Sequence, residues 1–472
     1  MTKDTLVVLQ PTLSLGDPHI CSDGKDRVSL ISAVYEALIS RDGPGVYSPC
    51  LAESWRCDGE ARVWDFRLRR GVQFHDSREL GADDATASLE RVRSPKVGGA
   101  WGTQGVYASY LNGAEFEAVD KGRVRITLTE PMADLLDLLA EMPIVPEEDL
   151  DELPEEHVGS GLYKVDDFDE EKVVMTAHAR HWRGKPHHNR LLWRAEPEEP
   201  DRLKLVGSSE ADIASGITPE GKKSSNSSRI GLVSRYGSMC VIYMMNCSQG
   251  PCRDVRVRRA LNLALNRGDI VEKIMLGAAE QLTGHLTPLH LGWDPDTPGY
   301  AYDPDEAKRL MAEAGHRGGL TIRMDAPTES PDEALPLSRL MAEQYREVGV
   351  ETELRVHRDR PGYAEMVRAK RIGDLCCFDS SPLSTFRVMR EKIHSGLRGP
   401  WWEGYTSREV DALIDSAQRS PEREERQRTY RRAYGAISSD APWVFLYRPE
   451  YSWALKHGGD WAPSWDCVIR VS

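Results

Sequence analysis

The sequence lacks any long apolar stretch. None of its segments approaches the run of about 18 apolar residues that a membrane-spanning helix needs. This excludes an integral membrane protein built on spanning helices. Hydrophobic residues make up 40% and charged residues 29% of the chain, which is typical of a globular protein. At 472 residues, the chain is longer than one hydrophobic core usually supports, so we expect two or three domains.

The chain also lacks an excess of positive charge. Its 61 Lys and Arg residues are outnumbered by 75 Asp and Glu residues, which gives a formal net charge of -14. A nucleic-acid-binding protein needs a basic stripe to contact phosphates, and here basic and acidic residues are mixed throughout. Nucleic acid is therefore excluded as a partner. The acidic balance suits cationic or zwitterionic small ligands, although it serves solubility equally well.

No familiar catalytic motif stands in a suitable context. The sequence has no G-x-S-x-G, H-E-x-x-H, P-loop or G-x-G-x-x-G segment suitably placed, and no nucleophile beside a base. We therefore expect no catalytic residues, no metal and no cofactor. Metal-like spacing occurs in His178, His181, His187 and His188, but these residues flank the turn at 181–186. This placement favours a surface turn over a zinc site.

Cysteine pairs of the C-x-x-C type are absent. Nine cysteines are present, an odd number, so at least one is unpaired under oxidising conditions. Their spacing indicates neither a zinc site nor a thioredoxin-like pair. Buried or reduced thiols are the expected state. The number of thiols also mildly favours a reducing compartment.

The first ten residues lack an export signal. They contain no basic segment followed by an apolar stretch, and no small-residue cleavage site or lipid-accepting cysteine follows. Either a signal peptide has been removed or the protein stays in the cytoplasm.

Apolar residues recur with the periods of strands and helices along the chain. Alternation predicts strands at 63–69, 123–130 and 349–356, and short apolar runs predict strands at 5–9 and 240–246. Helical spacing predicts helices at 28–40, 82–92, 253–271, 303–314 and 336–348. The third helix is expected to break at 266–268, with Asp269 as a new N-cap. The acidic run at 146–156 is typical of a surface linker. The alternation indicates an α/β fold, mixed with α+β structure at 40–157.

Several motifs together resemble one protein family. They are Y-E-A-L-I (35–39), L-A-E-S-W (51–55), F-R-L-R-R-G-V-Q-F-H-D-S-R-E-L-G-A-D-D (66–84), H-W-R-G-K-P (181–186) and R-D-V-R-V-R-R-A-L-N-L-A-L-N-R (253–267). In order and spacing they resemble the extracellular solute-binding proteins of family 5, the peptide, nickel and opine class. The resemblance runs from Leu15 to about Tyr451.

The resemblance implies a two-lobed periplasmic-binding-protein-like fold of class II type with an additional inserted domain. Lobe I would comprise 1–39, 158–240 and 440–472. The inserted α+β domain would comprise 40–157, and lobe II 241–439.

The resemblance also implies binding rather than reaction. A monomer would capture a small zwitterionic solute, such as a short peptide, an opine-like compound or an amino-acid derivative. It would deliver this solute to an ABC transporter permease, from the periplasm or the cell surface. Ligand contacts that exist only in the shut state would drive closure of the lobes. Two alternatives stay open. One is a cytoplasmic family member whose cleft serves as an enzyme or ligand sensor, and the other is uptake of a metal chelate.

The segment D-L-C-C-F-D-S-S-P-L-S (374–384) is the best candidate for the ligand site. A strand is expected to end at Phe378, so that Asp379 and Ser380 precede a helix capped by Ser384. Open α/β sheets bind ligands where a strand leads into a helix. By resemblance, Asp379 stands for the aspartate that pairs with the ligand amine in peptide-binding members, although Cys376 replaces their tryptophan. Alternatively, Asp379 caps the Ser-Ser-Pro turn.

Arg387 follows in the first turns of the expected helix, where a cation lies close to the positive end of the helix dipole. This position calls for a compensating anion, and we expect a ligand carboxylate. The alternative is an ion pair with Asp379 or exposure to solvent.

Aromatic side chains supply the remaining candidates. Trp401, Trp402 and Tyr405 fall in a short loop bounded by glycines, and Trp101 lies in another glycine-rich segment. Rings on loops offer rigid contact area and cation-π faces to amines. We therefore expect these four side chains to contact the ligand, with packing in the interior as the alternative.

Overall fold

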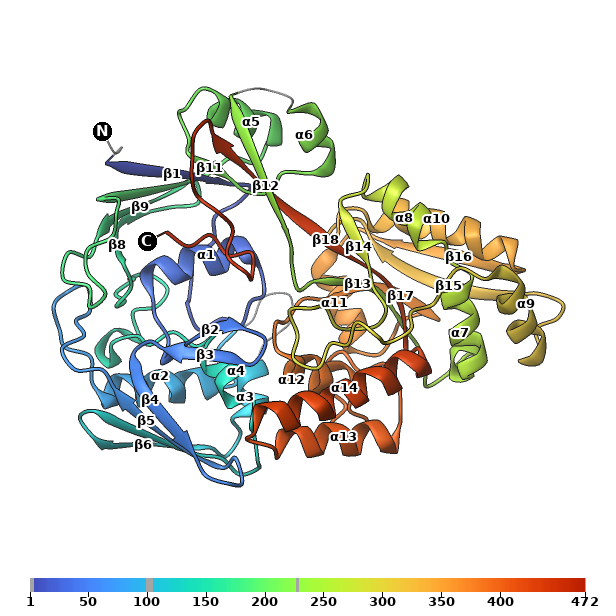
Figure 1. Cartoon of the computed structure of the whole chain (residues 1–472), viewed down its shortest axis with the longest axis horizontal. Coiled ribbons are helices and arrows are strands. Elements are labelled where there is room, and N and C mark those ends of the chain that lie inside the picture. Colours follow the sequence, from blue (N-terminus) through green and yellow to red (C-terminus); the bar gives the residue numbers. More distant parts are fainter. Residues whose placement is uncertain (1–3, 99–104, 226–228, 472) are drawn as a thin grey trace. The chain divides into compact units, whose positions relative to one another are not determined.

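The computed structural model of the chain describes residues 4–98, 105–225 and 229–471 (Figure 1). Within these ranges, no helix combines the length and the apolar character needed to cross a membrane. Nor does a disulfide join any of the nine cysteines, and most of their side chains are buried, as the sequence predicted.

The chain forms two compact units. The first comprises Met1–Arg235 with Tyr451–Ser472, and the second comprises Tyr236–Glu450. Each unit has hydrophobic cores of its own on the faces of a mixed sheet, so the predicted α/β class is confirmed. The separate inserted domain at 40–157 stays a prediction.

The main sheet of the first unit has the strand order β11-β1-β10-β9-β8. Its strands are β1 (Thr5–Gln10), β8 (Tyr163–Phe168), β9 (Lys172–Ala177), β10 (Arg190–Ala195) and β11 (Ile213–Ala214). β1 pairs in parallel with both β10 and β11, whereas the pairs of β9 with β8 and β10 are antiparallel. The carboxyl ends of β1, β10 and β11 therefore lie along one edge of this sheet.

Different helices cover the two faces of this sheet. Successive side chains of a strand point to opposite faces. Val8 packs in a core with Leu30 of α1 (Lys25–Val34), whereas Leu9 packs in another core with Val206 of α5 (Glu199–Gly207). α1 and α5 accordingly lie on opposite sides of β1 (Figure 1).

The remaining elements of the first unit lie mostly between α1 and β8 in the sequence. They include an antiparallel sheet of order β4-β5-β7-β6 and a hairpin of β2 and β3. Their bounds are β2 (Ile39–Gly43), β3 (Val46–Pro49), β4 (Ala52–Cys57), β5 (Val63–Leu68), α2 (Ala82–Arg93), α3 (Val106–Tyr110), β6 (Glu115–Asp120), β7 (Arg123–Thr127), α4 (Leu135–Leu139), η2 (Glu147–Asp149), α6 (Pro219–Ser224) and β12 (Ile230–Tyr236). The strands predicted at 63–69 and 123–130 and the helix at 82–92 are confirmed as β5, β7 and α2.

The sheet of the second unit has the strand order β16-β15-β17-β13-β18, with β14 also paired to β18. The strands are β13 (Cys240–Met245), β14 (Ala279–Gln281), β15 (Leu320–Pro327), β16 (Val350–His357), β17 (Leu375–Ser380) and β18 (Trp443–Lys456). β15 is parallel to β16 and to β17, and β13 is antiparallel to its neighbours. The last residues of β18 belong to the first unit and pair there with β11.

Helices cover both faces of this second sheet as well. Met341 of α10 shares a core with Met324 of β15, and Tyr363 of α11 shares the other core with Phe378 of β17. The helical elements of the unit are η3 (Pro251–Arg253), α7 (Val255–Leu263), α8 (Arg267–Ile274), α9 (Pro304–Glu313), α10 (Ala334–Glu347), α11 (Arg360–Arg368), α12 (Thr385–Val388), η4 (Met389–Ile393), α13 (Arg408–Gln418) and α14 (Arg423–Asp440).

The helix predicted at 28–40 is wrong at both ends. α1 begins at Lys25 and ends at Val34, because the Val34 carbonyl accepts a hydrogen bond of 2.9 Å from the Gly161 N–H. The glycines of this turn allow the contact: a Cβ on Gly159 would lie 2.1 Å from the Val34 oxygen. The chain then turns into β2, so a tertiary contact overrides the helical periodicity.

Two other predicted ends also differ. The N-cap of α8 is Asn266, whose side chain accepts the Asp269 N–H at 3.1 Å, so the N-cap predicted at Asp269 is wrong. Asparagine is as good an N-cap as aspartate, and Asp269 instead lies in the first turn. β17 runs to Ser380, beyond the predicted end at Phe378, because its pairing with β13 continues.

Candidate ligand-binding site

Three helices of the second unit begin at one edge of its sheet. β15 lies between β16 and β17 and is parallel to both, so the carboxyl ends of the three strands share this edge. α10 follows β15, α11 follows β16 and α12 follows β17. α10 and α11 cover opposite faces of the sheet. Open α/β sheets bind ligands where successive connections turn to opposite faces. Asp379 and Ser380 end β17 and therefore lie at such an edge.

Asp379 is partly exposed and pairs with Val241 of β13. Its carboxylate accepts a hydrogen bond from the Ser381 hydroxyl, a local contact typical of an aspartate in a turn. Its backbone carbonyl accepts another from Lys392 Nζ at 2.8 Å. Ser380 is buried, and its Oγ has no hydrogen-bond partner within the part of the chain that the structure describes. The contact of Asp379 and Ser380 with a ligand stays a prediction.

A second carboxylate lies near Asp379. Glu333, the residue before α10, accepts a hydrogen bond of 2.8 Å from the Tyr447 hydroxyl. Burial raises the pKa of Glu333, and the charges of Asp332 and Asp379 raise it further. Carboxylates that disfavour each other's ionisation in this way are stabilised by a cation, such as an ammonium group.

Cations also approach this edge. Arg360, at the start of α11, places its guanidinium carbon 5.8 Å from the centre of the Phe378 ring, and Lys392 Nζ lies 5.2 Å from it. The edge therefore combines two carboxylates with two cationic groups, and both cationic groups lie near the Phe378 ring. Sequence reasoning missed Glu333, Arg360 and Lys392, although Glu333 stands just before the helix predicted at 336–348.

Arg387 is buried, with only 1% of its surface exposed. Its Nε lies 3.1 Å from Glu391 Oε1, one helical turn later, and its N–H donates to Ser384 Oγ at 3.3 Å. The predicted N-cap at Ser384 is thus confirmed. The anion beside Arg387 is Glu391, so a ligand carboxylate is not required to compensate its charge. Its contact with a ligand stays a prediction.

The aromatic loop lies largely in the interior. Trp401 and Tyr405 are buried. The Trp401 ring lies 4.9 Å from that of Phe378, and the Tyr405 hydroxyl donates to Asp440 at 2.7 Å. Trp402 is half-buried, and its Nε1 donates to the Tyr405 carbonyl at 2.6 Å. Of the three, Trp402 presents the most accessible ring, and Trp401 supports the strand residue before Asp379.

Trp101 lies outside the described residues, so its predicted ligand contact stays a prediction. No group of three or more His, Cys, Asp or Glu side chains that could hold a metal occurs in 4–98, 105–225 and 229–471. The predicted surface position of the histidines is wrong for His178 and His181, which are buried. His181 Nε2 lies 3.4 Å from Glu36 Oε1, because the 181–186 turn packs against the residues after α1.

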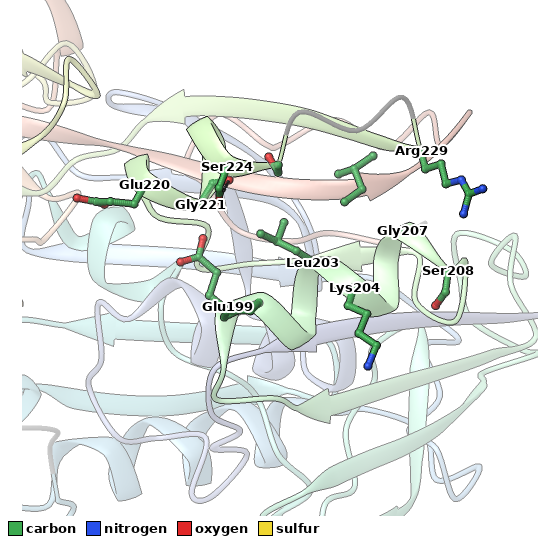
Figure 2. A pocket seen from close by; sticks show the side chains of 12 residues that line it. Glu199, Leu203, Lys204, Gly207, Ser208, Glu220, Gly221, Ser224 and Arg229 are labelled. Carbon is green, nitrogen blue, oxygen red and sulfur yellow. Dashed lines mark hydrogen bonds between the residues drawn. The ribbon is translucent and has the colours of Figure 1, made fainter.

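A cavity of about 770 Å³ lies between α5, α6 and the start of β12 (Figure 2). Leu203 and Ile230 line its apolar part, and Lys204, Glu220 and Arg229 supply charges. A second cavity, of about 620 Å³, lies in the other unit beside η3. Neither cavity is lined by those predicted ligand residues that the structure describes.

A comparison with known families decides the class of this protein. The family model described as "Bacterial extracellular solute-binding proteins, family 5 Middle" matches residues 46–374. The chain belongs to this family. The resemblance inferred from the sequence motifs is thus confirmed, and with it the prediction of a solute-binding protein.

Relatives of this family 5 protein match it over nearly its whole length. Heme-binding protein A of Haemophilus influenzae is 25% identical over 488 residues, covering 94% of this chain and 87% of that protein. Glutathione-binding protein GsiB of Escherichia coli (strain K12) is 24% identical over 464 residues, covering 94% and 88%.

Solved structures share its fold. HbpA2 from Haemophilus parasuis aligns with a TM-score of 0.83 at 20% identity, over 98% of each chain. NikZ from Campylobacter jejuni in complex with Ni(L-His) aligns with a TM-score of 0.79 at 21% identity, over 99% of this chain and 98% of that one. The predicted periplasmic-binding-protein-like fold is therefore confirmed, and both the fold and the family are those of transport binding proteins.

In this family 5 protein, we expect the buried Glu403 of the aromatic loop to make the free energy of unfolding depend on pH. Its Oε1 lies 3.7 Å from Lys370 Nζ and has no hydrogen-bond partner among the described residues. Burial raises the pKa of Glu403 from 4.5 to about 7, although the Lys370 charge opposes the rise. Between pH 4.5 and about pH 7, Glu403 keeps its proton in the folded state and has lost it in the unfolded state. The free energy of unfolding therefore falls as pH rises through this range.

We expect Glu403→Gln to remove this pH dependence. The shift corresponds to about 3 kcal/mol, so the variant should gain up to that amount relative to wild type between pH 5 and pH 8. Urea unfolding at both pH values measures the difference. Glu409→Gln, at an exposed position on α13, controls for the loss of one charge. A difference from wild type that is the same at both pH values would contradict the prediction.

Proposed function

We propose that this family 5 protein captures a small zwitterionic solute, such as a short peptide, an opine-like compound or an amino-acid derivative, for ABC-type import. It acts outside the cytoplasmic membrane, as a monomer, and delivers the solute to a permease without changing it covalently. The observation that carries this proposal is the edge formed by β15, β16 and β17, where Asp379 and Glu333 lie near Arg360 and Lys392.

Both signs of charge at one strand edge suit a solute that is itself zwitterionic. Asp379, with Glu333 beside it, would take the solute's ammonium group, because an opposite charge relieves the repulsion between the two carboxylates. Arg360 or Lys392 would take its carboxylate. Arg387 is the weaker candidate for that role, since Glu391 already compensates it. The half-buried Trp402 offers a ring for the body of the solute.

The names of relatives and solved structures support a small organic solute without fixing its identity. They include binding proteins for heme and for glutathione, a protein in complex with the peptide STSA, and another in complex with agropinic acid. Several of these compounds combine amine and carboxylate groups. A solute of that kind agrees with the mixed charges at the strand edge.

Native mass spectrometry of the purified protein tests the proposal first, because a co-purified solute appears as added mass. A thermal-shift screen then compares glutathione, short peptides, opines, heme and the nickel complex of histidine. A ligand at 100 times its Kd adds about 2.7 kcal/mol of stability, which gives a clear shift. Binding of a zwitterion that is recovered unchanged supports the proposal. Turnover of the solute, or binding of heme or the nickel complex alone, overturns it.

A further inference from the structure

His357 lies at the same edge of the second unit as the candidate site. It is the last residue of β16, whose carboxyl end shares this edge with those of β15 and β17. Its ring lies 5.1 Å from that of Tyr363, and the Arg360 guanidinium carbon lies 5.6 Å from the centre of the same ring. His357 and Arg360, a cation assigned to the solute carboxylate, therefore lie beside one aromatic side chain.

A buried carboxylate fixes one nitrogen of the His357 ring. Nε2 lies 2.9 Å from Asp325 Oδ1, and the Asp325 side chain is 0% exposed. Asp325 Oδ2 accepts a hydrogen bond of 2.6 Å from the Gly373 N–H, so the carboxylate is itself held in place. An ionised carboxylate only accepts hydrogen bonds, so the proton of a neutral imidazole stays on Nε2. Nδ1 is then a hydrogen-bond acceptor.

That acceptor is open to a bound molecule. His357 Nδ1 makes no hydrogen bond to the residues that the structure describes, and the atom is not enclosed by them. The His357 side chain is 27% exposed, in contrast to the fully buried Asp325. An N–H group of a solute at this edge can therefore reach Nδ1.

The spacing of the strands indicates which N–H group of the solute this is. β15 lies between β16 and β17, so the ends of these two strands are two strand spacings, about 10 Å, apart. We therefore expect Asp379, at the end of β17, and His357 to bind two different nitrogens. A peptide extends by about 3.3–3.6 Å per residue, so a tripeptide matches this length. Its last amide N–H lies next to its terminal carboxylate, as His357 lies near Arg360.

We propose that His357 selects peptides, because its Nδ1 accepts a hydrogen bond from the last amide N–H of the solute. This inference rests on the proposed function and deepens it: the ammonium group of the peptide binds Asp379, and its terminal carboxylate binds Arg360. A free amino acid with a single nitrogen does not satisfy Asp379 and His357 together. The solute class is thus short peptides, and tripeptides match the length of the edge.

Isothermal titration calorimetry with matched solutes tests this hydrogen bond. The probes are triglycine, trialanine and trileucine, each paired with an analogue in which an ester oxygen replaces the last amide N–H. The ester keeps the size of the peptide but presents an acceptor to Nδ1 in place of a donor. A site that accepts a hydrogen bond rejects a solute that cannot donate it. At pH 8, where the neutral imidazole is favoured, we expect the wild-type protein to bind the best peptide about tenfold more tightly than its ester.

Asp325→Asn tests whether the position of the ring proton matters. Asparagine can still accept the Gly373 N–H while its amide group donates to His357 Nε2, which moves the ring proton to Nδ1. We expect the preference for the amide to vanish or to reverse. Loss of a merely structural contact would instead weaken peptide and ester alike. His357→Phe keeps a ring beside Tyr363 and should also lose the preference.

His316→Phe is the matched control, because His316 is a half-buried histidine that follows α9 in the same unit, and this variant should keep the preference. Equal binding of peptide and ester by the wild-type protein, or a preference that persists in Asp325→Asn and His357→Phe, would overturn the role of His357 alone. If neither variant folds, the wild-type comparison decides. A protein that binds free amino acids or opines but none of the three peptides would also overturn only this inference. One that binds no zwitterion would overturn the proposed function with it.

Discussion

Arg387→Met is expected to lower the free energy of unfolding by about 3–5 kcal/mol in the absence of solute. The guanidinium is almost fully buried and lies 3.1 Å from Glu391 Oε1, which is buried as well. Removing it leaves a buried carboxylate without its neighbouring cation, which is far more costly than the loss of an exposed ion pair. Urea unfolding followed by circular dichroism measures the change.

The double variant Arg387→Met with Glu391→Met serves as the control. Replacing both members of a buried ion pair by apolar side chains is often close to neutral, so most of the lost stability should return. This variant also keeps the test valid if the single variant fails to fold. If Arg387→Met loses less than about 1 kcal/mol while solute affinity falls, Arg387 binds the solute, as first predicted from the helix dipole.

The surroundings of Arg387 show which of its features could be predicted from the sequence and which could not. Its place in the first turns of a helix was predicted correctly, because Ser384 is a recognisable N-cap. The compensating anion was sought in the ligand, yet Glu391 stands four residues later. That spacing places two side chains on the same side of a helix, so the pair was readable from the sequence.

Elements with strong periodicity were predicted within a few residues, because one buried face fixes both the type and the register of an element. The helix at 82–92 and the strand at 349–356 match α2 and β16. The end of α1 was missed because Gly161, far away in the sequence, donates its N–H to the Val34 carbonyl. Periodicity carries no information about such a contact.

The residues of the candidate site were likewise predicted only in part. Asp379 was found because it directly follows a short apolar run that leads into a capped helix. Glu333 and Arg360 were missed because their nearness to Asp379 depends on which strands are neighbours. The order of strands in the sheet cannot be read from periodicity.

Asp379→Asn is expected to weaken the binding of an amine-bearing solute by about 2 kcal/mol, or about 30-fold in Kd. The amide keeps an acceptor for the Ser381 hydroxyl but removes the negative charge that would pair with the ammonium group. This loss of binding free energy is at the lower end of the range for a desolvated ion pair, because Glu333 still supplies a carboxylate nearby. Isothermal titration calorimetry with the best solute of the screen measures it.

Two comparisons separate a ligand contact from a structural turn. Asp305→Asn, at an exposed position on α9, removes the same charge elsewhere in the unit and should leave Kd unchanged. Ser381→Ala removes the turn contact of Asp379 while keeping its charge, so it should affect affinity less than Asp379→Asn does. If instead Asp379→Asn and Ser381→Ala lower the melting temperature by similar amounts and Kd stays at the wild-type value, Asp379 serves the turn. The solute amine must then bind elsewhere on this edge.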